Sequence, residues 1–519
     1  MRKTILTYVF FLTCFNLKSQ PPLNQWYDLG GTQSLINSIH STDSCYYFTG
    51  LAHGAIPPIS WNLVFAKMDY NGSVVSQTNY VCDTIGVNGI NCVGSNLLPT
   101  LDGNFITVND YDDVFLITKF SPDGDTIASR FITHYQYNQN FTSIWPSKII
   151  QNQVDSSYAV TLTIQHNLTL EMRIGLAIYD KNLTAISFKT VPILLPGYAY
   201  IYSRDINYES DGFLLSSDIV KPGITLAEDT SRTMLVKTDL SGNEQWRWID
   251  WDFENEAFSN SLTSTPDGGY LYAGISGAYK LETNSNQYVA SVTKLGNTLN
   301  EEWQITLGDS IGESGINFTD IKPIGMNEFV VCGYQYSGDS SVIGSLVAFN
   351  LSGQILWDSY FTFVNASDIY NYPWHELYEV EITPDGGYLL AGKAEDWVAL
   401  GNGNPGSFGW VVKTDSVGCL VPGCQDFFSV SEIEKPKVQI SLYPNPAKNL
   451  LNIYYYDPLF SSGELMQVFD LQGKLIRELP IKTNDITYLY DISALTVGTY
   501  ILMVTNHGLE RASVKFVVE

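Results

Sequence analysis

Short apolar runs alternate with turns rich in Gly, Asn and Asp along most of the chain, and one such pattern recurs at a regular interval. Its two clearest copies, Asp267–Gly274 and Asp385–Gly392, differ at a single position. Five looser copies carry an aromatic residue at the same point as the two clear ones. The seven aromatic residues are spaced by 59, 53, 55, 57, 59 and 59 positions: Tyr46, Phe105, Tyr158, Phe213, Tyr270, Phe329 and Tyr388. So even a period predicts seven copies of one structural unit.

Each copy predicts four short strands separated by turns. In the sixth copy the strands are Phe318–Ile324, Phe329–Gly333, Leu346–Asn350 and a last strand that follows Gly353 and carries Trp357. Aromatic residues make up 13% of the chain and charged residues 16%, a balance that favours strands over helices. Four antiparallel strands joined by Gly turns are typical of a propeller blade, which buries its faces against its neighbours. We therefore expect an all-β protein in which residues 21–428 form a seven-bladed β-propeller.

The seventh copy lacks a fourth strand, because no Trp-bearing segment follows Gly418. The segment 25–31, which contains Trp26, resembles the fourth strand of another copy, Trp303–Gly308. We expect residues 25–31 to close the seventh blade and so to join the two ends of the ring. The alternative is that Gln425–Val430 supplies the missing strand.

A change of composition over residues 429–437 predicts a linker, and residues 438–519 predict a second domain. Alternating apolar strands separated by Pro-Asn-Pro, Gln-Gly and Val-Gly turns favour a small Ig-like β-sandwich there. Four short motifs follow in order and include Tyr443, Pro444, Asn445, Pro446, Gly473, Lys474, Gly498, Tyr500 and Lys515. With these motifs the domain resembles the type A C-terminal sorting domain of Bacteroidetes proteins exported by type IX secretion.

This resemblance implies that the type IX secretion machinery recognises the domain at the outer membrane and often removes it there. The cargo is then released or attached to surface lipopolysaccharide. The alternative is an Ig-like accessory module without a sorting role.

Residues 1–20 carry Arg2 and Lys3 before an apolar run from Ile5 to Phe15, which predicts a secretory signal peptide. No second run of about eighteen apolar residues follows, so we expect no transmembrane segment. The protein should pass through the periplasm to the outer-membrane surface or the extracellular space.

A formal net charge of −26 without any Lys/Arg run argues against nucleic acid as a partner. The oxidising exterior permits disulfides, and a tight turn between Cys419 and Cys424 predicts one there. Cys82 and Cys92 are a second candidate pair for a disulfide. Cys45 and Cys332 fall in blades that are not neighbours, and we expect both to be buried free thiols.

The sequence predicts no catalytic residue, metal site or cofactor. Its histidines are isolated, and Trp374-His375-Glu376 lacks the second His of a zincin helix. No Gly-x-Ser-x-Gly motif or phosphate-binding loop is present. The acidic stretch Asp110–Asp113 lacks the spacing of a calcium loop and favours a solvated turn.

Aromatic residues gather in the connections between successive blades, which all lie on one face of a propeller. They and a neighbouring histidine are Tyr135, Tyr137, Phe141, Trp145, Tyr198, Tyr200, Tyr202, Trp251, Phe253, Tyr370, Tyr372, Trp374 and His375. Such rings can bind a glycan or a protein, or can fill the wedges between blades. We expect a non-enzymatic binding or adhesion protein; the alternative is an extracellular hydrolase of polysaccharide or peptide with carboxylates at the channel mouth.

Overall fold

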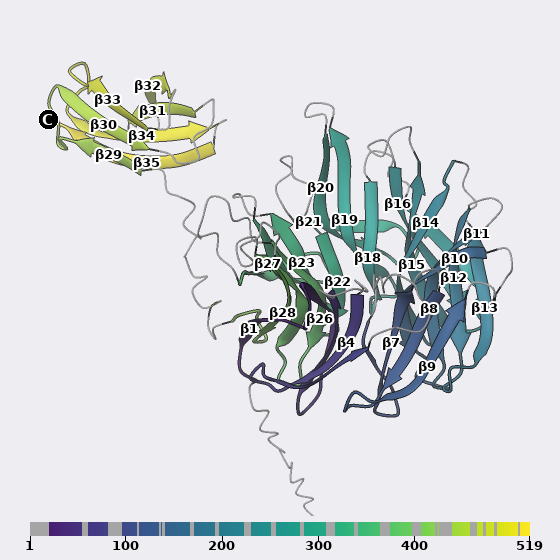
Figure 1. Cartoon of the computed structure of the whole chain (residues 1–519). Helices are drawn as coiled ribbons and strands as arrows, with labels where there is room; N and C mark the ends of the chain where they lie inside the picture. Colours follow the sequence, from purple (N-terminus) through teal and green to yellow (C-terminus); the bar gives the residue numbers. More distant parts are fainter. Residues whose placement is uncertain are drawn as a thin grey trace, which may run out of the picture. The chain divides into compact units, whose positions relative to one another are not determined.

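The computed structural model divides into two compact units, Met1–Gly423 and Cys424–Glu519, and consists almost entirely of strands (Figure 1). It describes residues 20–53, 61–80, 96–111, 114–133, 136–137, 141–166, 171–192, 197–222, 230–250, 256–280, 285–307, 317–336, 341–363, 374–396, 406–420, 424, 439–456, 464–470, 474–481, 485–506 and 509–519. Residues 1–19 of the predicted signal peptide, the Cys82–Cys92 pair and the predicted linker lie outside these residues.

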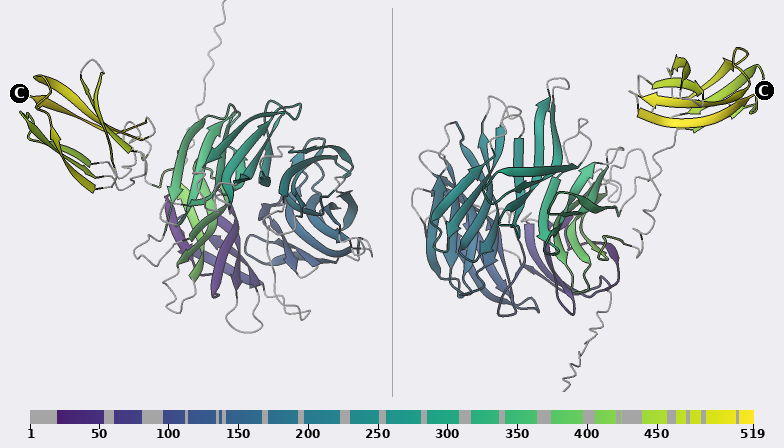
Figure 2. Two further views of the ribbon diagram at one scale, coloured as in Figure 1. Left: turned by 90° about the horizontal axis from the view of Figure 1, so that it is seen from above. Right: turned by 180° about the vertical axis from the view of Figure 1, so that it is seen from behind.

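The first unit contains seven groups of antiparallel strands that follow one another along the chain (Figures 1 and 2). The first three blades are β2 (Gln33–Ser41) to β5 (Val74–Tyr80) with β3 (Tyr46–His53) and β4 (Trp61–Met68); β6 (Leu98–Pro99), β7 (Phe105–Tyr111), β8 (Val114–Phe120) and β9 (Thr126–Thr133); and β10 (Phe141–Gln151), β11 (Tyr158–His166), β12 (Met172–Tyr179) and β13 (Ala185–Pro192). Blades four and five are β14 (Tyr200–Glu209), β15 (Gly212–Lys221), β16 (Thr230–Asp239) and β17 (Glu244–Ile249); and β18 (Glu256–Ser264), β19 (Tyr270–Lys280), β20 (Ser285–Leu295) and β21 (Glu301–Leu307). Blade six is β22 (Asn317–Pro323), β23 (Glu328–Tyr336), β24 (Val342–Asn350) and β25 (Ile355–Phe361).

Blade seven combines the two ends of the propeller. It contains β26 (Trp374–Ile382), β27 (Tyr388–Asp396) and β28 (Gly406–Thr414), and its fourth strand is β1 (Leu23–Tyr27). β1 pairs antiparallel with β28, so that Trp26 lies opposite Trp410. The buried Trp410 donates its indole N–H to Asn24 Oδ1 at 2.8 Å. The closing strand β1, Leu23–Tyr27, therefore begins before the segment 25–31 that the sequence predicted and overlaps its first part.

A buried apolar cluster lies at each junction between neighbouring blades, including the junction of blade seven with blade one. In that last cluster Leu389 and Val411 of blade seven pack with Ile36 and Phe48 of blade one. The other six junctions have corresponding clusters in chain order. Because every described blade contacts two others, the seven sheets close into a ring, and the middle strands are buried on both faces. This double burial explains why a third strand such as β24 is almost continuously apolar.

The recurring Asp-Gly turn has a structural reason. In four blades its Asp pairs with a buried Lys of the third strand, at N–O distances of 2.6–3.2 Å: Asp102 with Lys119, Asp211 with Lys237, Asp267 with Lys294 and Asp385 with Lys413. In three of these four turns the glycine after the Asp adopts a positive φ, which is +83° at Gly386 and is strained for other residues. The repeat therefore encodes blade architecture.

The predicted disulfide between Cys419 and Cys424 is present. Cys45 and Cys332 are free and buried, as expected.

The second unit is a small Ig-like sandwich. One sheet contains β29 (Gln439–Tyr443), β30 (Leu450–Tyr456) and β33 (Asp485–Asp491), and the other contains β31 (Glu464–Asp470), β32 (Leu475–Pro480), β34 (Gly498–Asn506) and β35 (Leu509–Val518). Their inward side chains form a single core that includes Leu451, Tyr455, Val468, Leu502 and Phe516.

Candidate ligand-binding site at the centre of the propeller

The innermost strands of the propeller carry β-bulges at equivalent places, after Ile36, Pro146, Ser203, Ser259, Phe318 and Leu377. A bulge inserts one extra residue and redirects the side chains beside it. The residue after each bulge, with Asn96 in blade two, belongs to a ring of polar side chains that we call the polar belt: Ser38, Asn96, Lys148, Asp205, Ser261, Asp320 and Glu379.

The polar belt links each blade to the next. At six junctions the belt side chain accepts a hydrogen bond from the backbone N–H just after the belt position of the next blade, at 2.7–3.3 Å: Ser38 from Leu97, Asn96 from Ile149, Asp205 from Leu262, Ser261 from Ile321, Asp320 from Val380 and Glu379 from Ile39. At the seventh, Lys148 Nζ lies 2.6 Å from Asp205 Oδ1. The belt is therefore a second closed ring, made of polar contacts.

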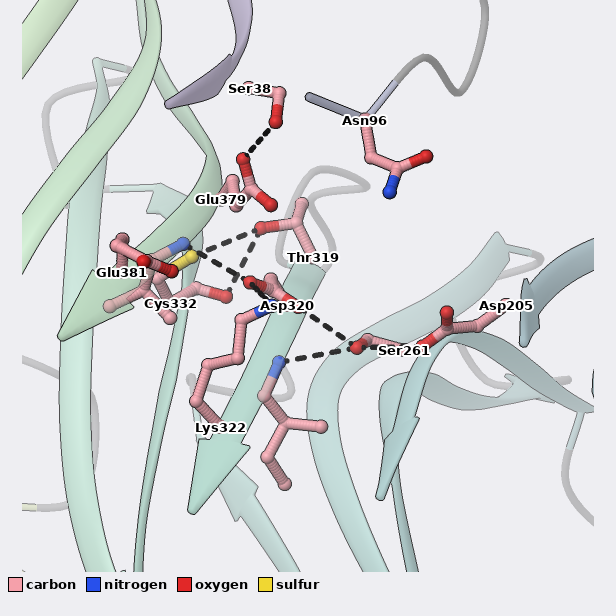
Figure 3. A network of polar contacts seen from close by, with 12 residues as sticks. Ser38, Asn96, Asp205, Ser261, Thr319, Asp320, Lys322, Cys332, Glu379 and Glu381 are labelled. Atoms are coloured by element: carbon pink, nitrogen blue, oxygen red, sulfur yellow. Dashed lines mark hydrogen bonds and ion pairs between the residues drawn. The ribbon is translucent and has the colours of Figure 1, made fainter. Parts of the chain in front are cut away.

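Charge is concentrated where blades six, seven and one meet (Figure 3). Lys322 Nζ lies 3.3 Å from Asp320 Oδ2, and His40 Nδ1 lies 2.9 Å from Glu381 Oε1. Burial opposes the charge on Lys322, but the surrounding carboxylates outweigh it and raise the pKa of this amine. Burial also raises the pKa of Glu379 to about 7, although Lys322 and the hydrogen bonds from Ser38 and Ile39 act in the opposite direction. Three of the belt's side chains are carboxylates, and all three accept backbone N–H groups, a structural use of these acids.

A cavity of about 430 Å³ opens beside the belt. The described residues that line it come from blades two to five, mainly from the innermost strands β10, β14 and β18: Asp110, Trp145, Pro146, Ser147, Thr163, Met172, Tyr202, Ser203, Arg204 and Asn260. Side chains from four successive blades meet only near the axis of a propeller. We call this pocket the central cavity, and its volume is in the range of small-ligand sites.

Arg204 is held in place by a buried acid. Its Nε donates to Asp218 Oδ2 at 2.6 Å, and the Asp218 side chain is 0% exposed. Asp218 Oδ1 accepts the Ser259 N–H at 2.8 Å. Burial raises the pKa of the Asp218 carboxyl, while Arg204 and this N–H act against the rise. The guanidinium carbon of Arg204 lies 5.8 Å from the centre of the Tyr202 ring.

The cavity offers donors, acceptors and ring faces together. Among the described residues, no hydrogen bond or ion pair involves the Nη groups of Arg204, so these remain donors for a ligand. Asn260 uses its amide N–H groups on Asn317 Oδ1 at 2.6 Å and the Phe318 carbonyl at 2.8 Å, which leaves its Oδ1 as an acceptor. Trp145 and Tyr202 supply the aromatic surface, and Tyr202 is 41% exposed.

The structure separates the aromatic residues singled out from the sequence. Trp145 and Tyr202 line the central cavity, and Tyr200 is exposed at the start of β14. Tyr137 instead stacks on Phe188, with ring centres 3.9 Å apart, and Tyr198 packs against the cluster between blades three and four. The sequence expectation that also covers Tyr135, Trp251, Phe253, Tyr370 and Tyr372 falls on positions outside the described residues.

On blade seven, Trp374 donates its indole N–H to Glu376 and contacts the edge of Tyr336. It is not one of the described residues that line the cavity. His375 is fully buried, and its Nε2 accepts the Phe363 N–H at 3.0 Å while its Nδ1 lies 3.1 Å from the Val342 carbonyl oxygen. Both residues are engaged within their own part of the ring.

Sequence reasoning missed Arg204, Asn260, Met172 and Thr163, together with the whole polar belt. The signal for the belt was present, because its members are spaced by 58, 52, 57, 56, 59 and 59 residues. Extending the repeat from the second strand back to the first would have shown this spacing. The bulges that direct these side chains leave no signature of their own in the sequence.

In the C-terminal unit the motif residues hold the sandwich together. Asn445 donates to the Lys515 carbonyl at 3.1 Å and accepts the Val517 N–H at 2.9 Å, which ties the Pro-Asn-Pro turn to β35. The Tyr500 hydroxyl donates to the Thr496 carbonyl at 2.9 Å. Tyr443, Lys474 and Lys515 are exposed and Gly498 is half-buried, whereas Gly473 lies outside the described residues.

Across the described part of the chain, no three or more His, Cys, Asp or Glu side chains are grouped so that they could hold a metal ion. No helix in that part is long and apolar enough to cross a membrane.

Several solved propellers are distantly similar to this chain. The propeller of Dos1 covers 74% of this chain over 81% of its own, with 14% identity and a TM-score of 0.40. The propeller domain of the Trilobed protease from Pyrococcus furiosus covers 77% of this chain over 99% of its own, with 7% identity and a TM-score of 0.37. An α-L-arabinofuranosidase from Fusarium graminearum covers 76% of this chain over 97% of its own, with 10% identity and a TM-score of 0.37. No curated protein matches the chain in sequence. These likenesses are too distant to assign a function, and the blade count rests on strand pairing.

The C-terminal unit has a clear family match. Residues 441–519 match the secretion system C-terminal sorting domain. Such a tail implies export by the type IX secretion system to the cell surface or the extracellular space. The chain therefore combines a β-propeller with a C-terminal domain that belongs to the type IX sorting family.

Proposed function

We propose that the propeller is a non-enzymatic binding module that works outside the cell and takes its ligand in the central cavity. The observation that carries this proposal is the lining of the cavity, which combines two aromatic rings with an arginine that is oriented by a buried carboxylate. Ring faces supply apolar contact area at low entropic cost, and a pre-oriented guanidinium supplies directed donors. Binding sites typically combine such an apolar wall with a few fixed polar groups.

The acids near the axis favour binding over hydrolysis. Glycoside hydrolysis needs two carboxyl groups placed on either side of the scissile bond. Asp110 is the one carboxylate among the described residues that line the central cavity. Asp205, Asp320 and Glu379 accept hydrogen bonds from backbone N–H groups in the polar belt. These carboxylates thus have a structural use at the junctions between blades.

The test compares four forms of the chain from residue 20: wild type, Trp145→Ala, Tyr202→Ala and Tyr360→Ala. Tyr360 is the matched control, because it is a strand tyrosine of similar exposure, 38% against 41%, on the outer strand β25. Each form is applied to an array of polysaccharides and extracellular proteins, and reducing ends and new amino termini are measured in parallel.

We expect binding signals of the wild type to fall in Trp145→Ala and Tyr202→Ala and to persist in Tyr360→Ala. Equal signals in all four forms would overturn the proposal. Release of reducing ends or peptides by the wild type would establish the hydrolase alternative instead.

A further inference from the structure

The charges around the central cavity bear on the class of ligand, and this inference rests on the proposed binding function. Arg204 is the cationic side chain among the described lining residues, and Asp110 is the anionic one. The positive charge of Arg204 is already balanced by Asp218, 2.6 Å away and fully buried. The walls of the cavity therefore present both signs of charge with no net positive excess.

A ligand with one formal charge gains little in such a place. An anion would meet Asp110 and the field of a chain with a formal net charge of −26. A cation would find an acceptor in Asp110, but the Arg204 guanidinium of the same cavity can only donate and offers a cation no acceptor. In either case the ligand would also lose hydration of its own charge. A neutral ligand that carries several donors and acceptors avoids both costs.

The polar groups match hydroxyls. A hydroxyl both donates and accepts, so it can accept from the Arg204 Nη groups and donate to Asn260 Oδ1 or to the Asp110 carboxylate. The position of Asn260 is fixed, because its amide N–H groups are bound to Asn317 and Phe318 of blade six. Planar side chains held in this way are suited to pairs of neighbouring hydroxyls.

The apolar groups match the face of a ring. Trp145 lies half-buried against the cluster between blades three and four, and Tyr202, which also lines the cavity, is 41% exposed. A pyranose ring has an apolar C–H face and a rim of hydroxyls, which is the same combination that the cavity offers. We infer that the central cavity binds an uncharged sugar unit of a glycan, with its face on Trp145 or Tyr202 and its hydroxyls on Arg204, Asn260 and Asp110.

The experiment is calorimetric titration of the chain from residue 20 with three sets of probes of matched length. The neutral set contains β-glucan, mannan and xylan oligosaccharides, the anionic set oligogalacturonates, and the cationic set chitosan oligomers. We expect binding within the neutral set, with a dissociation constant that changes less than about twofold between about 50 and about 500 mM NaCl. Trp145→Ala or Tyr202→Ala should weaken it about tenfold or more, whereas Tyr360→Ala should not.

Preferential binding of galacturonate or chitosan, weakened by salt and lost in Tyr202→Ala, would overturn the inference of a neutral sugar and leave the cavity as the binding site. Binding of array proteins but of none of the three glycan sets would also overturn it. Binding of neutral glycans that survives both Trp145→Ala and Tyr202→Ala would place them elsewhere and overturn the inference together with the proposed function. Unfolding by urea, measured for each variant, separates these results from loss of folding.

Discussion

The junction that closes the ring should depend on pH through Glu379. Its Oε2 accepts the Ile39 N–H at 2.8 Å and the Ser38 hydroxyl, and so joins blade seven to blade one. Burial raises the pKa of this carboxyl from 4.5 to about 7. Between these two values the folded protein holds a proton that the unfolded chain has lost. The free energy of unfolding must therefore fall as the pH rises through this window.

The size of the effect follows from the two pKa values. Over pH 5.5 to 8 the titration corresponds to about 2 kcal/mol, and partial exposure of the carboxylate reduces it to about 1–2 kcal/mol. The range begins at pH 5.5 because the chain has a pI of about 4.5 and would be poorly soluble lower down. The variant Glu379→Gln keeps an acceptor for the Ile39 N–H and removes the titration. Its unfolding free energy should lack this part of the pH dependence.

Tryptophan fluorescence during urea unfolding is a suitable assay, since all 11 tryptophans precede residue 424 and report on the propeller alone. Ser38→Ala is the matched control, because it weakens the same junction and leaves the carboxyl group in place. If wild type and Glu379→Gln change in parallel from pH 5.5 to 8, the carboxyl does not carry a raised pKa and the reasoning is wrong.

Three further changes test other parts of the molecule. Asp385→Asn removes the charge partner of the fully buried Lys413, 3.2 Å away, and should lower the free energy of unfolding by about 3 kcal/mol, while adding Lys413→Met should recover most of it; failure of this rescue in urea unfolding would show that the ion pair is not the cause. Asn24→Ala leaves the indole N–H of buried Trp410 without its acceptor and should cost about 1–3 kcal/mol in the same assay, against no measurable loss if β1 does not hold blade seven. Deletion of residues 441–519 in a bacterium with type IX secretion should retain the protein in the periplasm, as seen by cell fractionation and immunoblotting, and continued export would refute the sorting role.

The blades could be predicted because the same local needs recur in each. In four blades the turn Asp meets a buried Lys, as Asp267 meets Lys294 at 3.0 Å, and the second strand of each blade places a large ring at the start of its buried run. These needs fix residue types at a set spacing, so the period appears in the sequence. The sorting domain could be recognised from its sequence for a similar reason, because Asn445 and Tyr500 each stabilise a particular turn.

The central cavity could not be predicted in the same way. Tyr137 precedes β10 and Trp145 lies within it, only a few residues further along the chain, yet Tyr137 stacks on Phe188 whereas Trp145 lines the cavity. Their difference depends on which neighbouring strand each ring meets, and that contact arises only when the blades have assembled. Arg204 gave no signal because its partner Asp218 is on another strand, fourteen residues along the chain.

Comparison of equivalent positions nevertheless shows where the ring departs from its own symmetry. Trp145 and Tyr202 each stand two residues before the bulge of their innermost strand, whereas blade seven has Glu376 at this place, bound to its neighbours Trp374 and Tyr378. Positions that pack at the junctions between blades carry similar residues from blade to blade, because neighbouring blades pack in the same way at every junction. Blade five has a third aromatic residue, Phe258, at this position, whereas blades one and six have Leu35 and Asn317 there. The aromatic residues at this position therefore belong to successive blades on one side of the ring, and two of them line the central cavity with Arg204, where we propose that the ligand binds.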